Sequence, residues 1–417
     1  MNFNQHLDEI MNGGLPVLTS KLRNYFFTHF WSFVSTPIAV PTIILIRCLK
    51  PWRLIKFGSL PYSRIGHFTA DTGQEWAIQC SKNKKDLVIY WLPSDTCNSF
   101  WSEMVKRNFK VYGFARCLQF WNERIPGGDV HKYNPGQKGS RDIQGHLEKT
   151  EANLPFFSTE DNQAEAWLSG MGWKKGEPFV CLLVRDSAYL NKQSHIKNRR
   201  DWRYHDYRNS DIDSYVPACE WLADQGVWVL RMGKIMAKPF RSNRPRIIDY
   251  AFHPDKSDFL DIWLFAHCTF CISTGSGPDA ISDIYRRPML FVNLLPISQL
   301  VSWSDAIHFP KYLIWKTSGK HLSFKEYLEK TFLHTQKYEE AGIEIIDLTA
   351  DDILHAVKER WIRLQGKWVD SGEDNELQER FWEIFKSWPK FSKYHGYIHP
   401  ESRIGTHFLR NNPEFLQ

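Results

Sequence analysis

Hydroxyl and glycine residues stand together at 273–277, where the chain reads Ser-Thr-Gly-Ser-Gly. They follow a short apolar, β-branched run at 269–272 and precede Pro278, so a buried strand, a tight turn and a helix are predicted. Free N–H groups of the turn and the positive end of the helix dipole would point to one place, which favours a bound phosphate. The glycines could also serve only to form the turn. The phosphate-site candidates are Ser273, Thr274, Gly275, Ser276 and Gly277.

Basic side chains follow two further predicted strands. Arg185 comes directly after 179–184, and Arg231 and Lys234 stand at the end of 227–230. Because the carboxyl ends of parallel strands meet at one edge, where α/β sheets bind ligands, we expect these cations to converge on the same turn. The alternative for Arg185 is a surface ion pair with the aspartate that follows it. The turn lacks the lysine of a Walker A loop and the third glycine of a dinucleotide fingerprint, so neither ATP nor NAD is predicted.

An acidic pair, Asp211 and Asp213, resembles the short motif that holds a metal beside a nucleotide-sugar. Ser210 precedes it and a helix is predicted after it, so N-terminal capping explains these residues better. Cys268 and Cys271 form a CxxC in an apolar run without further ligands nearby, and we interpret them as buried. We therefore expect no metal site. Further candidates for ligand contacts are Gly66, Tyr189, Arg208, Asn209 and Asp258.

A glycine–histidine pair with an aspartate four residues later, Gly66-His67 and Asp71, provides candidates for acid–base chemistry. An apolar strand at 86–91 and a helix at 98–107 are predicted next, and this βαβ rhythm indicates a parallel sheet. A turn at the edge of such a sheet is where ligands bind. His67 and Asp71 are therefore candidate catalytic groups, although a histidine beside a glycine is more often a structural hydrogen-bonding residue.

The composition limits the function. The 417 residues suffice for two domains, and the 18 tryptophans suit cores, membrane interfaces and sugar-stacking surfaces. A net charge of +6 fits phosphorylated ligands or an anionic membrane better than extensive wrapping of nucleic acid. The eight cysteines have no regular spacing, which indicates a reducing compartment. An aromatic and basic loop at 191–208 keeps RNA binding as an alternative.

Residues 25–49 are very apolar, interrupted by Pro37 and Pro41 and flanked by lysines and arginines. The apolar run begins too late for a secretory signal and lacks its cleavage site. Its length is close to the roughly 20 residues that a membrane span needs. The prolines favour instead an insertion into the membrane interface, with basic side chains on lipid phosphates. The alternative is a proline-broken pair of helices packed on the body of the protein.

Strands predicted near 180, 227, 247, 269 and 289 alternate with helices, which indicates one Rossmann-like domain. The predicted division of the chain is a membrane-associating segment at 1–56, a Rossmann-like N-terminal domain at 57–165, a Rossmann-like C-terminal domain at 166–395, and at 396–417 a last helix that could cross back to the N-terminal domain.

Taken together, the sequence resembles a family of bacterial glycosyltransferases associated with surface-polysaccharide gene clusters. The segments that carry the resemblance are spread over about residues 55–410. They are RIGHFTAD (64–71), VRDSAYL (184–190), RNSDIDSYVPA (208–218), GVWVLRMGK (226–234), the whole stretch 247–282, RRPMLFVNLLP (286–296) and RIGTHFL (403–409). The 273–278 segment is also similar in layout to the donor-site turn of heptosyltransferase-like and fucosyltransferase-like enzymes of the GT-B type.

This resemblance implies an α/β fold of the GT-B type, with two Rossmann-like domains facing each other across a cleft. The acceptor would belong to the N-terminal domain and the nucleotide-sugar to the C-terminal one. Arg185, Arg231, Lys234 and the turn would stabilise the leaving diphosphate without a metal. If the reaction inverts configuration, Asp71 or His67 would deprotonate the acceptor hydroxyl. No cofactor is expected, since the nucleotide-sugar is the substrate.

The predicted function is the transfer of a sugar to a cell-surface polysaccharide or a lipid-linked glycan. The predicted partners are the nucleotide-sugar donor, the glycan or lipid-linked acceptor and a membrane surface, with no nucleic acid. The predicted location is cytoplasmic and peripheral, on the inner face of the cytoplasmic membrane. A non-catalytic nucleotide- or sugar-binding module and an RNA-binding protein are the alternatives.

Overall fold

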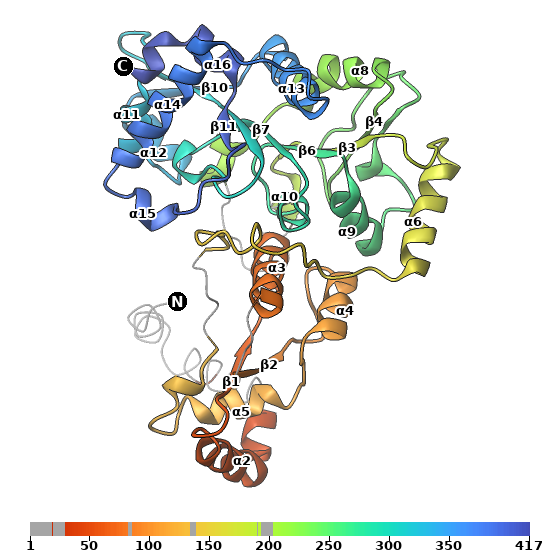
Figure 1. Cartoon of the computed structure of the whole chain (residues 1–417), viewed down its shortest axis with the longest axis vertical. Helices are drawn as coiled ribbons and strands as arrows, with labels where there is room; N and C mark the ends of the chain where they lie inside the picture. Colours follow the sequence, from red (N-terminus) through yellow and green to blue (C-terminus); the bar gives the residue numbers. More distant parts are fainter. Residues whose placement is uncertain (1–18, 20–29, 82–85, 134–138, 190, 193–202) are drawn as a thin grey trace. The chain divides into compact units, whose positions relative to one another are not determined.

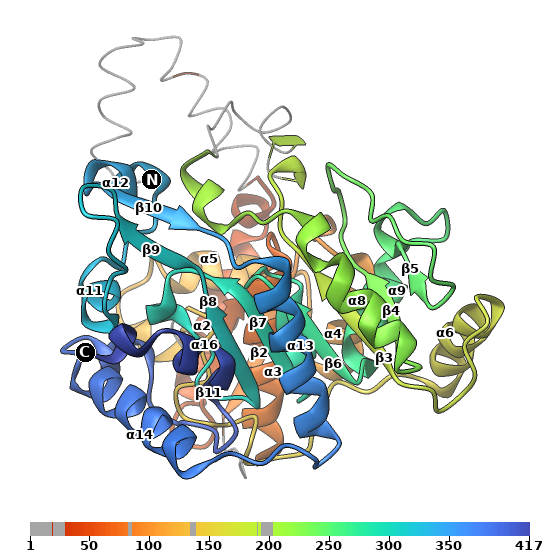
Figure 2. The same cartoon turned by 90° about the horizontal axis from the view of Figure 1, so that it is seen from above.

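The computed structural model describes residues 19, 30–81, 86–133, 139–189, 191–192 and 203–417, and the chain divides into two compact units (Figures 1 and 2). The small unit comprises Met1–Leu60, Asn83–Thr96 and Val105–Pro135. The large unit comprises Pro61–Lys82, Cys97–Met104 and Gly136–Gln417.

The small unit is built on two parallel strands, β1 (Ile55–Ser59) and β2 (Leu87–Trp91). Helix α2 (Thr36–Cys48) packs against α5 (Ala115–Asn122) and continues through Pro41. Side chains that recur at helical spacing on one side of α2 enter the apolar core of this unit. The buried members of this core are Ala39, Ile43, Ile46, Phe57 and Leu118.

The large unit is organised by a seven-stranded parallel sheet with the order β11-β8-β7-β6-β3-β4-β5. Its central strands are buried along their whole length, as expected for a sheet with helices on both faces. The strands are β3 (Phe179–Leu183), β4 (Trp228–Arg231), β5 (Ile247–Ile248), β6 (Phe270–Ser273), β7 (Met289–Leu294), β8 (Ala306–Pro310) and β11 (Arg403–Ile404).

Helices cover both faces of this sheet. Figures 1 and 2 show α8 (Val216–Asp224) and α13 (Ala350–Leu364) on one face, and α9 (Asp258–His267) and α10 (Asp279–Ile284) on the other. Helix α3 (Ile65–Ser81) packs on α10, and α6 (Ser158–Gly170) packs on α9. The predicted α/β architecture with parallel strands is therefore confirmed.

The remaining elements extend the large unit beyond β8. An antiparallel pair, β9 (Tyr312–Trp315) and β10 (Ile343–Ile346), is accompanied by helices that stand between and after the two strands, and Phe324, Phe381 and Phe415 of these helices form an aromatic core. These elements are α11 (Phe324–Glu329), α12 (Thr335–Glu340), α14 (Gly372–Ser387), α15 (Phe391–Tyr394), α16 (Thr406–Asn411) and η6 (Pro413–Leu416). The other elements are α4 (Ser99–Asn108), η1 (Asp129–His131), η2 (Arg203–Arg208), η3 (Ile212–Tyr215), η4 (Tyr250–Phe252) and η5 (Ile297–Gln299).

Two segments lie differently from their predicted places. The residues around Gly66 were predicted as a turn in an N-terminal domain; they form the first turn of α3, which belongs to the large unit because its small residues pack closely on α10. The C-terminal residues were predicted as a helix that could cross back to the N-terminal domain. They add the edge strand β11, which pairs with β8, before α16 begins at Thr406.

The chain reverses its direction across the sheet next to β3. It runs from β3 outward through β4 to β5, and then returns to form β6 on the other side of β3. Such a reversal leaves a crevice outside the carboxyl ends of the two strands, and open α/β sheets bind their ligands there. The β3/β6 edge is therefore the place to examine for a site.

Candidate functional site

The ends of β3 and β6 are joined by hydrogen bonds. The backbone N–H of Arg185 donates to Oγ1 of Thr274 over 3.1 Å, and the N–H of Thr274 donates to the carbonyl oxygen of Leu183 over 3.2 Å. Thr274 is buried. Its hydroxyl therefore fixes where Arg185 leaves the sheet.

The turn after β6 uses most of its own N–H groups. The N–H of Gly275 donates to Oγ of Ser273 (3.0 Å), and that of Ser276 donates to Oδ2 of Asp279 (2.7 Å). The Ser273 hydroxyl also donates to Asp279, over 2.7 Å. The expectation of free amides is therefore wrong for Thr274, Gly275 and Ser276, because the Leu183 carbonyl, the Ser273 hydroxyl and the Asp279 carboxylate already accept these hydrogen bonds. Helix α10 behind the turn has only six residues.

Asp279 is a buried acid at the centre of this turn. Burial raises the pKa of its carboxyl to about 6, opposed by the hydrogen bonds from Ser273 and Ser276 and by the charge of Arg208. The side chain of Arg208 comes from η2 and donates to the carbonyl oxygen of Gly275. The sequence predicted Arg208 and the turn as separate candidates, and the structure brings them together.

Two guanidinium groups lie close enough at this edge to repel each other. Burial, together with the charge of Arg208, lowers the pKa of Arg185 to about 10. Among the described residues, no hydrogen bond or ion pair joins the Arg185 guanidinium to an acceptor, so the alternative, an ion pair with Asp186, does not form. Burial also lowers the pKa of His205 to about 4, with added effects of Arg185 and Arg208. The β3/β6 edge therefore holds two cations, and the charge of Asp206 opposes the shift of Arg185 without forming an ion pair with it.

Arg231 and Lys234 lie at the end of β4 and differ from Arg185 in having counterions. Arg231 is 1% exposed; its Nη1 donates to Asp249 over 3.1 Å and its Nη2 to the carbonyl oxygen of Lys238 over 2.9 Å. Lys234 is half-exposed and donates to the carbonyl oxygen of Cys97 (3.1 Å) and to Asp258 (3.2 Å). The Arg231 side chain is thus part of the core, whereas Lys234 can still reach a ligand.

The candidate Asp258 is itself a connecting residue. Its Oδ2 accepts hydrogen bonds from the N–H and the hydroxyl of Ser99, over 2.7 and 2.9 Å. Although burial opposes the shift, these bonds and the charge of Lys234 lower the pKa of Asp258. The carboxylate therefore fixes the start of α4 to the end of β4, and its contribution to ligand binding remains a prediction.

The first turn of α3 packs on the turn after β6 through a direct contact between their two backbones. A Cβ added to Gly66 would lie 2.8 Å from Cα of Gly277, and one added to Gly277 would lie 3.1 Å from the backbone nitrogen of Gly66. Further along α3, a Cβ on Gly73 would lie 2.8 Å from the side chain of Ile284. The candidates Gly66 and Gly277, far apart in the sequence, thus pack directly against each other.

The candidate base Asp71 lies further along the same helix, α3, beside His67 and Ser140. Nδ1 of His67 lies 2.6 Å from Oγ of Ser140. Burial raises the pKa of Asp71, opposed by a hydrogen bond from Ser140 and by the charge of His67. Oδ1 of Asp71 is buried and has no hydrogen-bond partner among the described residues. A desolvated carboxylate that has one oxygen without a hydrogen-bond partner is suited to accept a proton.

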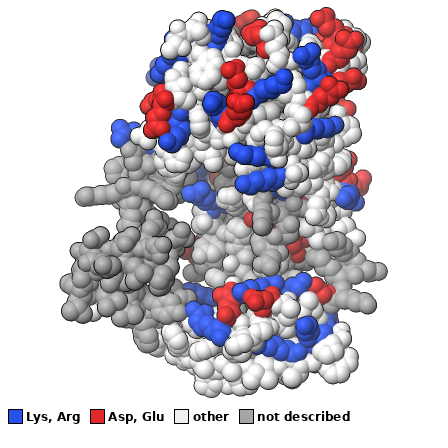
Figure 3. All heavy atoms as spheres, turned by 90° about the vertical axis from the view of Figure 1, so that its left-hand side faces the viewer, with Lys and Arg blue, Asp and Glu red and all other residues white. Residues whose placement is uncertain are grey.

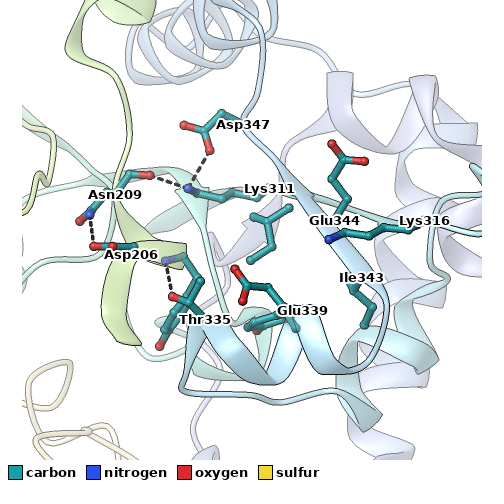
Figure 4. A pocket seen from close by; sticks show the side chains of 12 residues that line it. Asp206, Asn209, Lys311, Lys316, Thr335, Glu339, Ile343, Glu344 and Asp347 are labelled. Carbon is teal, nitrogen blue, oxygen red and sulfur yellow. Dashed lines mark hydrogen bonds and ion pairs between the residues drawn. The ribbon is translucent and has the colours of Figure 1, made fainter. Parts of the chain in front are cut away.

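A pocket of about 460 Å³ lies along the same side of the large unit, close to the ends of β8 and β10 (Figure 4). At its inner wall, Nζ of the buried Lys311 donates to the carbonyl oxygen of Asn209 (2.5 Å) and pairs with Asp347 (2.7 Å). Its other lining residues are mainly polar: Asp206, Tyr207, Lys316, Thr335, Tyr338, Glu339, Ile343, Glu344 and Ile345. Asn209 directly follows Arg208, so the same segment lines the pocket through Asn209 and contacts the turn after β6 through Arg208.

The sequence did not single out Ser140, Lys311 or Asp347. Lys311 could have been found by the rule that selected Arg185, because it directly follows the strand β8. Ser140 stands in a stretch without periodicity and has a positive φ of 58°, so nothing in the pattern indicated it. Tyr189 is half-buried, and burial raises its pKa. Most of the predicted 191–208 loop and residues 25–29 of the apolar segment lie outside the described residues.

The two metal-like motifs have structural roles. Asp211 caps η3 by accepting a hydrogen bond from the N–H of Asp213, as predicted, and both acids pair with Lys238. Cys268 and Cys271 are buried, also as predicted. Among the described residues, no cluster of three histidine, cysteine or acidic side chains is arranged to hold a metal ion.

Comparisons with known proteins give a distant structural likeness. No protein family profile and no curated protein matches the sequence. The structure is similar to ADP-heptose LPS heptosyltransferase II of E. coli (TM-score 0.41, 12% identity, 75% of this chain and 99% of that one) and to a family 9 glycosyl transferase of Veillonella parvula (TM-score 0.44, 9% identity, 75% and 97%). It is also similar to the E. coli heptosyltransferase WaaC with ADP-2-deoxy-2-fluoro heptose (TM-score 0.31, 9% identity, 57% and 88%). Values this low leave the substrates of this chain open.

Proposed function

We propose that the chain is a glycosyltransferase that moves a sugar from a nucleoside-diphosphate donor to a cell-surface glycan or lipid-linked acceptor, without a metal. The observation that carries the proposal is the unpaired, half-buried guanidinium of Arg185 beside Arg208, at the point where the order of the strands reverses. A buried cation without a counterion is unfavourable unless an anionic ligand supplies one. The motifs quoted from the sequence, which resemble bacterial glycosyltransferases, support the choice of a sugar donor.

The reaction breaks the bond between the anomeric carbon and the diphosphate oxygen, and the acceptor oxygen forms the new bond to that carbon. Negative charge grows on the departing diphosphate. Arg185 would bind it through paired hydrogen bonds, and the half-exposed Lys234 would add a second cation. Arg208 holds the turn in place through the carbonyl oxygen of Gly275.

If the transfer inverts configuration, the acceptor hydroxyl must lose its proton to a base. We assign this role to Asp71, whose Oδ1 has no partner among the described residues. His67 and Ser140 would orient the other side of this group. The close contact of Gly66 with Gly277 keeps the first turn of α3, the helix that carries Asp71, against the donor turn.

The pocket beside Asn209 would hold the hydroxyl-bearing part of the donor. Its volume of about 460 Å³ is in the range of small-molecule sites. Carboxylates such as Glu339 and Glu344 accept hydrogen bonds from sugar hydroxyls, and they are the groups that specify such ligands. An acceptor linked to a lipid would further place the protein at the membrane surface, on its cytoplasmic side.

The test is isothermal titration calorimetry with a panel of nucleoside diphosphates, on the wild-type chain and on Arg185→Gln. Because hydrogen bonds to charged groups are worth about 1.5–3 kcal/mol, we expect Arg185→Gln to raise the Kd about tenfold or more. Arg244→Gln, at a surface pair with Asp224, is the matched control and should bind as the wild type does. Failure of every nucleoside diphosphate to bind would reject the proposal.

Catalysis is tested separately by the transfer of a labelled sugar from nucleotide-sugars to cell-envelope acceptors. We expect Asp71→Asn to bind nucleotide normally and to lose about 100-fold or more in kcat, the range for a general base. Nucleotide binding by the wild type without any transfer would favour the non-catalytic binding module instead.

A further inference from the structure

The exposed apolar side chains of the protein are concentrated in one short stretch of the small unit. Nine of the seventeen exposed large hydrophobic side chains of the described residues lie between 30 and 52. Four of them recur at intervals of seven residues and are among the most exposed: Trp31 (73%), Ile38 (65%), Leu45 (61%) and Trp52 (79%). Surface hydrophobic residues are normally scattered singly, so a concentration of this kind marks an interaction surface.

The side of α2 that carries Ile38 and Leu45 is not the side that packs in the core. Seven residues are almost two helical turns, so these two residues share one face of the helix. Ala39, Ile43 and Ile46 lie on the other side and join the core of the small unit. The helix is thus apolar on both sides, and the described residues cover only one of them. We call Trp31, Ile38, Leu45 and Trp52 the apolar ridge.

The sequence stretch that carries the apolar ridge is basic. Residues 30–70 contain five lysines and arginines and no aspartate or glutamate. Arg47 is used inside the small unit, where it donates to the carbonyl oxygens of Asn122, Ile125 and Pro126. Lys56 pairs with Asp86. Lys50 and Arg53 are exposed next to the ridge. Figure 3 shows the lower end of the small unit as an uncharged surface, bordered by Lys and Arg together with some Asp and Glu.

We propose that the apolar ridge, with Lys50 and Arg53, docks the protein onto an anionic membrane surface, lying in the interface without crossing it. The 13 residues of α2 span about 20 Å, less than the roughly 30 Å of a hydrocarbon core. No helix among the described residues is long and apolar enough to cross a membrane. Tryptophans at both ends of the ridge suit the headgroup level, and basic side chains suit anionic lipid phosphates.

The membrane is a better occupant than a second protein chain because of this combination of residues. An interface between two copies would bring Lys50 and Arg53 of both copies to one apolar patch, without an acid in residues 30–70 to pair with them. Anionic lipids supply the missing counterions and the apolar phase at the same surface. The docking does not depend on the proposed glycosyl transfer, since it involves no residue of the candidate site.

The experiment is co-sedimentation of the full chain with vesicles of phosphatidylcholine alone or mixed with phosphatidylglycerol. We expect binding to the anionic vesicles. Because burial of one large aliphatic side chain contributes about 1.5–3 kcal/mol, Ile38→Ser/Leu45→Ser should weaken partitioning about tenfold or more. The matched control, Leu333→Ser/Val369→Ser, removes two exposed apolar side chains elsewhere and should bind like the wild type.

The electrostatic part is tested with Lys50→Gln/Arg53→Gln against Lys325→Gln/Lys386→Gln, two exposed lysines of the large unit. Only the first pair should weaken binding to anionic vesicles and reduce its dependence on salt. Urea unfolding of each variant and nucleotide titration verify that the fold and the candidate site are intact. The proposal is overturned if the wild type binds no vesicles, or if the control variants lose vesicle binding as much as the ridge variants do. It is also overturned if Ile38→Ser/Leu45→Ser abolishes a dimer and leaves vesicle binding unchanged.

Discussion

Arg185 and Arg231 follow the same sequence rule and have different environments. Both stand at the carboxyl end of a buried strand, β3 for the first and its neighbour β4 for the second. Arg231 is buried against Asp249 and a backbone carbonyl, whereas Arg185 faces Arg208 and pairs with no acid among the described residues. The comparison teaches that a cation at a strand end indicates a ligand site only where the protein leaves its charge uncompensated.

The largest effect expected from this comparison is on stability. Arg231→Ala leaves Asp249 without its counterion, and breaking a buried pair costs about 3 kcal/mol in the free energy of unfolding. Urea denaturation followed by circular dichroism measures this loss. Nucleotide affinity, measured under conditions where the variant is folded, should stay at the wild-type value. A stable Arg231→Ala protein with weakened nucleotide binding would assign Arg231 to the ligand site and contradict the distinction between Arg185 and Arg231.

The next effect separates the two arginines by ligand-induced stabilisation. A nucleoside diphosphate at 100 times its Kd should raise the free energy of unfolding of the wild type by about 2.7 kcal/mol. Arg231→Ala should gain as much above its own lower baseline. Arg185→Gln should gain much less at the same ligand concentration, while its stability without ligand equals or exceeds that of the wild type. Equal stabilisation of both variants would contradict the distinction.

A smaller effect concerns Asp279, the buried acid beside the Arg208 contact. Its folded-state pKa of about 6 lies above the ordinary 3.8, so the folded protein holds this proton more tightly than the unfolded chain. Its contribution to stability is present below about pH 4 and is lost as the pH rises through about 6. Relative to Asp279→Asn, the wild type should therefore lose on the order of 1 kcal/mol across this window. Unfolding curves at several pH values measure the difference, and parallel pH profiles would refute it.

The smallest effect is expected at Lys234, which has a counterion, as Arg231 does, and a partly exposed charge, as Arg185 does. Its ammonium group is half-exposed and already paired with Asp258. Since exposed pairs are worth about 0.2–1 kcal/mol, Lys234→Gln should weaken nucleotide binding only about threefold. Calorimetry beside Arg185→Gln measures the ratio. A loss as large as that of Arg185→Gln would show that Asp258 does not compensate Lys234.

The elements of the large sheet could be predicted because their strands are short apolar runs. The strands that contain Val180, Val229 and Cys271 are buried on both faces, and this burial requires the composition that the sequence displays. The convergence of Arg185 with the 273–277 turn also followed from a rule of topology. The pairing of charges did not, because Asp249 lies 18 residues after Arg231 and no periodicity connects the two.

The division of the chain was harder to predict for the same physical reason. Helix α3 stands between two strands of the small unit in the sequence, and a βαβ rhythm predicts that it stays with them. Its membership in the large unit depends on the absence of side chains at Gly66 and Gly73, which allows close packing on Gly277 and Ile284. A missing Cβ permits such a contact without specifying the partner, so the sequence alone does not reveal it.

The contact between Gly66 and Gly277 has a consequence for the way this protein can change. An added Cβ at either position would approach the other backbone too closely, more so at Gly66 than at Gly277, so the two positions constrain each other although 211 residues separate them in the chain. An alanine at either site must push α3 away from the donor turn and shift Asp71 with it. In a library of variants, substitutions at the two glycines should therefore have non-additive effects on activity, because either one already separates α3 from the turn. Substitutions elsewhere in the site that raise activity should be found only in variants that retain both glycines.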